Sequence, residues 1–304
     1  MNRTIKTLDN RIDKALKDAK HLYFNDSDKF VLMSDCHRGD GSRSDDFANN
    51  QHLYYHALTT YYDKGFSYIE LGDGDELWEN KDFCEIASQH NHVFTLLKKF
   101  YDENRIYFIY GNHDMVKKNP RWISSYFYYC YDEWHRHKIP LFDGVKVYES
   151  IVLHHIDLKN EILLIHGHQA DFFNDRIWKM SRFLVRYLWR HLEIFGFNDP
   201  TGTAKNYEKR TSIEENLSNW SKHNKKILIA GHTHRPVFPK PSNTPSNGAY
   251  FNDGSCVHPR CITAIEIENS NISLVKWSIL TQSDGTLTVI RDIVEGPEKL
   301  SRYI

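Results

Sequence analysis

Five short apolar runs in this sequence each end in side chains that can bind a metal ion. Each run has the length and composition of a buried strand, and helical patterns follow several of them. This alternation predicts an α/β fold. In open α/β sheets, ligands bind at the carboxyl ends of the strands, so the five endings are expected to share one edge. The runs with their endings are KFVLMSDCH, FSYIELGDGDE, RIYFIYGNHD, EILLIHGH and KILIAGHTH.

The run KILIAGHTH shows how an extended chain can aim two ligands at one point. His232 and His234 are two residues apart, and side chains with this spacing point the same way in a strand. Asp35 and His37 repeat the spacing after the first run. Imidazole suits several transition metals. Because the chain has 18 histidines, one such pair can also arise by chance, and the prediction depends on the other runs.

The complete set of donors matches a site for two metal ions. The donors divide into one group for each ion and a bridge: Asp35, His37 and His234; Asn112, His166 and His232; and Asp73. Two ions about 3.5–4 Å apart can clamp the attacking and leaving oxygens of an in-line phosphoryl displacement. A hydroxide that bridges two cations forms near neutral pH, because each charge lowers the pKa of bound water. We therefore expect this hydroxide to attack phosphorus.

In chain order, the motifs DCH, GD, GNHD, HGH and GHTH resemble those of the calcineurin-like metallophosphoesterases. The resemblance runs from about residue 29 to residue 257. It implies the fold of that family, a four-layer α-β-β-α sandwich of two mixed sheets, and a binuclear metal-dependent phosphoester hydrolase. It also implies that His113 assists the leaving group, for which imidazolium is suited as a donor and a cation. Glu76 stands where the family orients this histidine, although many members carry Asp there.

Several neighbouring residues have two interpretations. His168 is an alternative ligand to His166. The register of the family favours His166. Arg38 and Arg235 flank ligands and are candidates for binding the substrate phosphate, which guanidinium groups suit. The alternative is that these arginines are solvated or pair with Asp40 or Asp45. Two further aspartates are expected to be loop and helix-cap residues: Asp171 and Asp175.

We expect one domain over residues 1–304, with an N-terminal helical extension over 1–28 and a helical cap insertion over 169–225. The first part of the insertion, RIWKMSRFLVRYLWRHLEIF, has apolar residues at helical spacing with basic residues between them. It is either an amphipathic helix packed on the core or a cap that holds an apolar or acidic part of the substrate. A third interpretation is peripheral contact with an anionic membrane.

The insertion is similar to that of the UDP-2,3-diacylglucosamine pyrophosphohydrolase branch, so pyrophosphate cleavage in a lipid precursor is an alternative function. A non-catalytic metal-binding scaffold is a second alternative, which the presence of His113 disfavours. The substrate stays open among monoesters, diesters, nucleotides, pyrophosphate lipids and phosphoproteins. We expect two divalent ions, manganese foremost, with iron or zinc as alternatives.

Composition limits the other classes of function. The formal net charge of −1 provides no basic field for nucleic-acid binding. No apolar run reaches the length of a membrane span, and the N-terminus lacks the apolar core of a signal peptide. The five cysteines form no CxxC pair and are expected to be reduced thiols in a cytoplasmic protein. Oligomeric state cannot be inferred from these features.

The pattern also predicts individual elements. We expect helices over residues 11–20, 47–64, 81–103 and 120–134. The last four strands of the chain follow one another without helices between them, and we expect them to form an antiparallel run.

Overall fold

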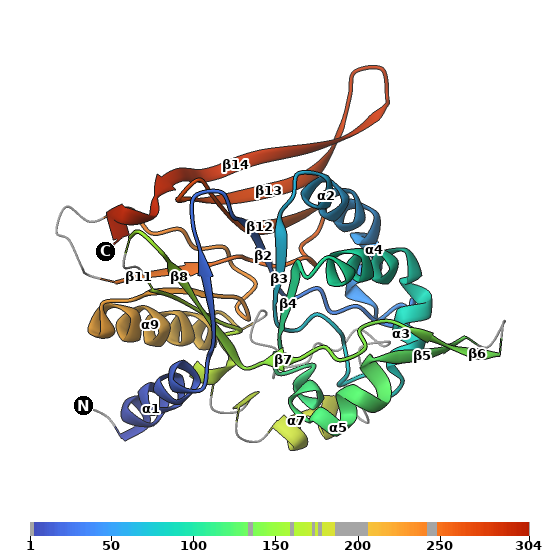
Figure 1. Ribbon diagram of the computed structural model, residues 1–304, viewed down its shortest axis with the longest axis horizontal. Coiled ribbons are helices and arrows are strands. Elements are labelled where there is room, and N and C mark those ends of the chain that lie inside the picture. The colour runs from blue at the N-terminus through green and yellow to red at the C-terminus, as the bar shows by residue number, and fades with distance from the viewer. Residues whose placement is uncertain are drawn as a thin grey trace.

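Two β-sheets stack face to face between outer helices (Figure 1). The computed structural model describes residues 3–132, 136–158, 161–171, 174–175, 178–185, 206–241 and 248–303. Over these residues, one sheet has seven strands in the order β14-β13-β12-β2-β3-β4-β7 and the other has five in the order β1-β8-β9-β10-β11. Both sheets are mixed, since each contains parallel and antiparallel pairs.

The strands of the larger sheet are β2 (Lys29–Met33), β3 (Ser67–Leu71), β4 (Ile106–Ile109), β7 (Val147–Tyr148), β12 (Cys261–Glu268), β13 (Asn271–Thr281) and β14 (Leu287–Lys299). The strands of the smaller sheet are β1 (Lys20–Phe24), β8 (Ser150–His155), β9 (Glu161–Ile165), β10 (Ile227–Ala230) and β11 (Ala249–Asn252). The longer helices are α1 (Arg3–Lys17), α2 (Gln51–Asp63), α3 (Phe83–Gln89), α4 (Asn91–Asp102), α7 (Trp178–Leu184) and α9 (Tyr207–Asn224). Shorter elements are η1 (Asp46–Asn49), η2 (Met115–Lys118), α5 (Pro120–Trp122), η3 (Ile123–Phe127), β5 (Tyr129–Asp132), β6 (His137–Pro140), η4 (His168–Ala170) and η6 (Leu300–Tyr303).

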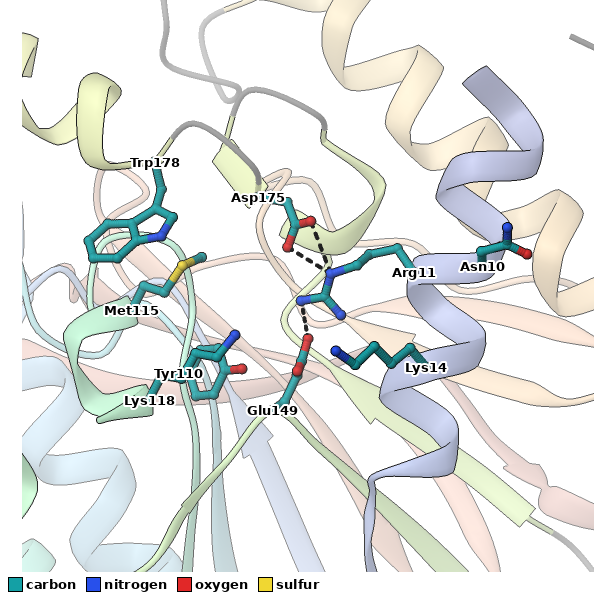
Figure 2. A pocket seen from close by; sticks show the side chains of 9 residues that line it. All are labelled: Asn10, Arg11, Lys14, Tyr110, Met115, Lys118, Glu149, Asp175 and Trp178. Carbon is teal, nitrogen blue, oxygen red and sulfur yellow. Dashed lines mark hydrogen bonds and ion pairs between the residues drawn. The ribbon is translucent and has the colours of Figure 1, made fainter. Parts of the chain in front are cut away.

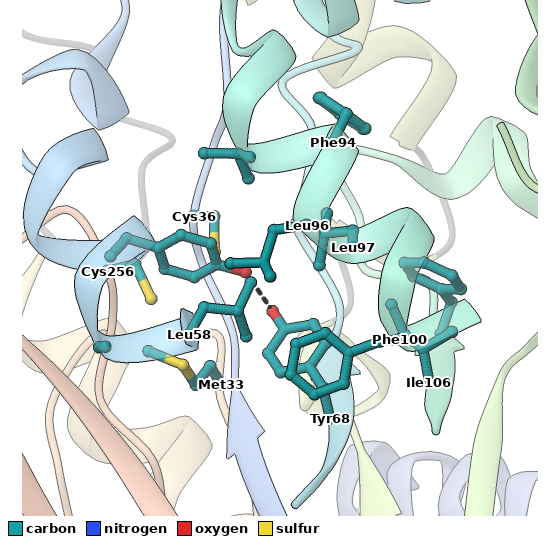
Figure 3. Close-up of a cluster of buried hydrophobic side chains, with 14 of the residues drawn as sticks. Met33, Cys36, Leu58, Tyr68, Phe94, Leu96, Leu97, Phe100, Ile106 and Cys256 are labelled. Carbon is teal, nitrogen blue, oxygen red and sulfur yellow. Dashed lines mark hydrogen bonds between the residues drawn. The ribbon is translucent and has the colours of Figure 1, made fainter. Parts of the chain in front are cut away.

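Strand β2 explains why the sheets form inner layers. Successive side chains of a strand point to opposite faces, and β2 is apolar on both. Val31 and Met33 pack in the cluster under α2 and α4, part of which Figure 3 shows. Leu32 packs in the cluster between the two sheets. Strands buried on both faces read as continuous apolar runs rather than alternating ones.

The smaller sheet is covered on its outer face by helices α1 and α9. Val152 of β8 and Leu228 of β10 share a buried cluster with Ile12 of α1 and Trp220 of α9. The layers are therefore helices, larger sheet, smaller sheet and helices. This confirms the expected four-layer α-β-β-α sandwich.

Some predicted elements differ from the structure. The N-terminal extension adds strand β1, which pairs with β8, so it is not purely helical. Strand β11 pairs parallel with β10, and the antiparallel run contains only β12, β13 and β14. The helix expected over 120–134 ends early and gives way to β5. The helix expected over 81–103 is divided at His90 into α3 and α4.

The predicted insertion is described in part. Its described elements are η4, α7 and α9, while residues 172–173, 176–177 and 186–205 of the expected cap lie outside the described residues. Among the described helices, none combines the length and the apolar content that crossing a membrane requires.

Candidate metal centre

The structure brings the seven predicted donors to one edge of the sandwich. Each follows the carboxyl end of β2, β3, β4, β9 or β10. Parallel pairing of β2 with β3 and of β3 with β4 places three of these ends side by side in one sheet. Parallel pairing of β9 with β10 does the same in the other sheet.

The first group of donors consists of Asp35, His37 and His234. His234 Nε2 lies 3.0 Å from Asp35 Oδ1. His37 Nε2 lies 3.4 Å from His234 Nε2 and 3.7 Å from Asp35 Oδ1. Three potential ligand atoms from two remote strand ends thus face one point.

The second group consists of Asp73, His166 and His232. Asp73 Oδ2 lies 3.1 Å from His166 Nε2 and 4.0 Å from His37 Nε2 in the first group. The other oxygen of Asp73, Oδ1, accepts a hydrogen bond from the backbone N–H of His113 at 2.7 Å. One carboxylate oxygen therefore lies between the two groups.

Hydrogen bonds on the outer side of the site orient the donor atoms. His37 Nδ1 donates to Glu76 Oε2 at 2.9 Å, and His166 Nδ1 donates to the carbonyl oxygen of Leu71 at 2.9 Å. Asp35 Oδ2 accepts from the backbone N–H of His232 at 2.9 Å. Such bonds select the tautomer and rotation of a metal ligand. They leave Nε2 of His37, Nε2 of His166 and Oδ1 of Asp35 directed into the site.

The donor atoms fit divalent cations. Asp35 Oδ1, Asn112 Oδ1 and His166 Nε2 are buried and make no hydrogen bond with acceptable geometry. Buried polar atoms in folded proteins nearly always have a partner. These three atoms lack such partners, which is the arrangement expected of ligands around a metal ion. The mixture of carboxylate, amide and imidazole donors accepts manganese, iron or zinc.

Five of the donors have a left-handed backbone, which is uncommon for residues other than glycine. Their φ angles are 51° for Asp35, 48° for His37, 50° for Asp73, 69° for His232 and 53° for His234. This conformation costs roughly 1–2 kcal/mol per residue, because Cβ crowds the following carbonyl oxygen. Strain of this kind collects at functional sites, where the surrounding structure enforces it.

His113 lies beside the first group. Its Nδ1 is 2.7 Å from Glu76 Oε2, the same oxygen that holds His37. Trp78 stacks on the His113 ring with centroids 4.2 Å apart, and the side chain is 25% exposed. Burial alone would lower the pKa of His113, but Glu76 and Asp73 outweigh it and raise that pKa. Burial opposes ionisation of Glu76, yet His113 and His37 bring its pKa down to about 2.

His166 and His168, left as alternatives above, occupy different places. His166 belongs to the second group. His168 is also buried, but its Nε2 lies 3.8 Å from Asp175 Oδ1, and it joins neither group of donors among the described residues. The geometry favours His166 as the ligand.

Asp171 is a residue of the site that sequence reasoning missed. Its Oδ2 lies 3.4 Å from His232 Nε2 and 2.8 Å from Lys209 Nζ of α9. The carboxylate is thus placed to orient a metal ligand. Asp171 has no distinctive spacing, and its contact with Lys209 spans the insertion, so no local signal could have identified it.

Of the two interpretations of Arg38, the geometry favours pairing with carboxylates over contact with the substrate, although its partners are not Asp40 or Asp45. Arg38 is completely buried. Its guanidinium group lies 2.8 Å from Glu70 Oε2 and 2.7 Å from Asp75 Oδ1, so a substrate cannot reach it. Arg235 differs, since its side chain is 47% exposed while it pairs with Glu214 of α9. Its contact with phosphate stays a proposal.

Replacement of Gly111 by alanine is expected to lower kcat/KM by roughly a hundredfold, the loss typical of a misplacement near 1 Å. A Cβ at this position would lie 2.1 Å from Asp73 Oδ1, so the carboxylate between the two groups would have to move. Steady-state kinetics and metal analysis measure the effect. Gly65→Ala is the control. A Cβ there meets no atom within 4 Å, and the φ of 78° makes the change costly for the backbone without disturbing the site, so it should keep its activity. Equal activity of the two variants would contradict the assigned position of Asp73.

A sequence model of the calcineurin-like phosphoesterase family matches residues 28–236. The match covers more than half of the chain, and it contains all seven donors. The chain therefore belongs to the calcineurin-like phosphoesterase family. Membership supports metal-dependent phosphoester hydrolysis as its class of reaction.

Solved structures of two other proteins match this chain at low sequence identity. Vps29 of Chaetomium thermophilum is 10% identical, with a TM-score of 0.40 over 88% of this chain and 95% of that chain. A cold-active protein-tyrosine phosphatase of a psychrophilic Shewanella species is 14% identical, with a TM-score of 0.38 over 89% and 83%. No curated protein matches the sequence.

Proposed function

We propose that this protein hydrolyses phosphoesters at a centre of two divalent ions, with manganese foremost. The observation that supports this proposal is the pair of adjoining donor groups with Asp73 Oδ2 between them. Asn112 would complete the second group through Oδ1, which is buried and makes no hydrogen bond. When bound, the ions supply a nucleophile from water near neutral pH and neutralise charge on the phosphoryl oxygens.

The protein itself contributes an acid beside this centre. The contact of His113 Nδ1 with Glu76 leaves Nε2 as the nitrogen that faces the leaving group. Because Glu76 and Asp73 favour the charged form of the ring, His113 is poised to donate a proton to the leaving oxygen or to stabilise its charge. Glu76 acts as a positioning residue through its contacts. Its side chain is longer than that of Asp, and it contacts both His37 and His113.

Removal of the metal tests the proposal. A chelator is expected to abolish hydrolysis of p-nitrophenyl phosphate, and added Mn²⁺ is expected to restore it. Release of p-nitrophenol measures both steps, and the matched control is Asp73→Ala, which should stay inactive after Mn²⁺ is added. A metal-loaded wild-type protein that cleaves no monoester, diester or pyrophosphate would overturn the proposal and favour a non-catalytic scaffold.

A further inference from the structure

A pocket of about 360 Å³ lies among α1, η2 and the beginning of α7 (Figure 2). Its size is within the range of sites for small molecules. The lining residues come from four separate parts of the chain: Asn10, Arg11 and Lys14; Tyr110, Met115 and Lys118; Glu149; and Asp175 and Trp178. The residues of α1 precede the segment that matches the family, so this pocket is built partly by an element outside that segment.

The pocket lies next to the metal centre. Tyr110 is two residues before the donor Asn112, and Met115 is two residues after His113. On the other side, Asp175 lies 3.8 Å from His168. The His168 ring is 5.5 Å, centroid to centroid, from that of the donor His166. A single buried histidine therefore separates one wall of the pocket from a ligand of the centre.

The carboxylates of the pocket already have cationic partners. Arg11 Nε lies 3.1 and 3.0 Å from the two oxygens of Asp175, and Arg11 Nη2 forms an ion pair with Glu149. Figure 2 shows Arg11 between these two side chains. This arrangement ties α1 to the body of the protein and occupies the negative charges that would otherwise repel an anion.

Three cationic donors remain for a ligand. Arg11 Nη1 is buried and has no hydrogen-bond partner, which is costly unless a ligand supplies one. Lys14 and Lys118 both line the pocket, and within the described part of the chain neither forms an ion pair. Charge-assisted bonds from such donors favour phosphate or carboxylate groups.

Aromatic and apolar side chains also line the pocket. Trp178 and Met115 lie across the pocket from Arg11 and Lys14 (Figure 2), and Tyr110 also lines the pocket. Aromatic and thioether side chains suit a flat or apolar skeleton. The pocket thus combines apolar side chains with cationic donors on two facing sides, Arg11 and Lys14 from α1 and Lys118 from η2.

We propose that this pocket binds a second anionic group, a phosphate or a carboxylate, on a flat or apolar part of the substrate. The substrate class is then a phosphoester that carries an anion remote from its scissile phosphate. This inference rests on the proposed function and adds a specificity determinant to it. Lys14 and Lys118 hold the remote anion, together with Arg11 Nη1.

Binding to metal-free protein tests the pocket independently of catalysis. Chelator treatment removes the metal ions that would otherwise hold a phosphonate at the centre. We expect calorimetry to detect phenylphosphonate binding to this metal-free wild-type protein, and its weakening in the variant below assigns the binding to the pocket. The double variant Lys14→Ala/Lys118→Ala should bind at least about fivefold more weakly, as expected for the loss of two exposed charge contacts. Lys17→Ala, on the same helix but outside the pocket, is the control. Equal binding by both variants would contradict the proposal.

Kinetics then connect the pocket to the substrate. We would compare phenyl phosphate with 4-carboxyphenyl phosphates that carry spacers of increasing length before the carboxylate. For at least one spacer, the wild type is expected to show a KM lower by about fivefold, a gain that the double variant loses while kcat changes little. Circular dichroism confirms that the variants fold.

The outcomes separate the two proposals. The pocket proposal is overturned if no spacer length lowers KM, or if the lower KM persists in the double variant. In either case, hydrolysis of phenyl phosphate would still uphold the proposed function. Binding of phenylphosphonate without any KM gain also overturns it, because the pocket would then serve a separate ligand. If metal-loaded wild type hydrolyses no phosphoester, the proposed function fails, and with it this assignment of substrate class.

Discussion

Replacing His113 by alanine is expected to lower kcat by about 10²–10⁴-fold, the range typical of general acid catalysis. The side chain contacts Glu76 and stacks on Trp78, and it belongs to neither group that we assign to the metal ions. Its backbone N–H, which binds Asp73 Oδ1, is kept in the variant. The metal ions and the fold should therefore remain while proton donation to the leaving group is lost.

Stopped-time assays with phenyl phosphate, whose leaving group is poor, together with elemental analysis of the purified variant, measure the effect. His52→Ala is a suitable control, since His52 is exposed on α2 and should leave kcat unchanged. A substrate with a much better leaving group should reduce the defect, because it needs less assistance. If His113→Ala keeps wild-type kcat on poor and good leaving groups alike, His113 is not the acid.

The second large effect is on stability, where Lys117→Met is expected to lower the free energy of unfolding by about 3–5 kcal/mol. Lys117 is 1% exposed. Its Nζ lies 2.6 Å from Asp75 Oδ2 and 2.8 Å from Asp114 Oδ2, in the same cluster as Arg38 and Glu70. Removing Lys117 leaves three buried carboxylates with one cation, which is costlier than the loss of an exposed pair.

The pKa of Lys117 agrees with this interpretation. Burial alone would lower it, yet the carboxylates of Asp114, Asp75 and Glu70 raise it, so the ammonium group stays charged in the folded protein. Denaturation by urea, followed by circular dichroism, measures the stability. The control Lys98→Met breaks an exposed pair with Asp102 and should cost less than about 1 kcal/mol. Equal costs for the two variants would contradict the role of the buried cluster.

This cluster also supports the metal centre. Asp114 Oδ1 accepts a hydrogen bond from the backbone N–H of Gly111 at 2.6 Å, and Asp75 follows Asp73 by two residues. Buried ion pairs of Asp75 and Asp114 thus stabilise the loops after β3 and β4. Arg38, a candidate from its position to contact substrate, has this supporting role instead. Its partners Glu70 and Asp75 are more than thirty residues away in sequence.

Much of the site was predictable because its signals are local. The spacing of two residues between His232 and His234, and between Asp35 and His37, identified these donors. The expected extended backbone was wrong, because β10 and β2 end before them and all four residues have a left-handed φ. What their spacing could not provide was how near the groups lie. The 4.0 Å between Asp73 Oδ2 and His37 Nε2 depends on the parallel pairing of β2 with β3.

By itself, the amino-acid sequence determined which residues could serve as donors and that buried strands would carry them, because these properties depend on short-range spacing and on side-chain chemistry. Tertiary structure alone decided which charges meet: Asp171 with Lys209, Arg38 with Glu70, and Arg11 with both Glu149 and Asp175. It also decided that β11 pairs parallel with β10. Such pairings depend on how distant segments pack when the sheets bury their apolar faces, and short-range spacing does not encode that packing.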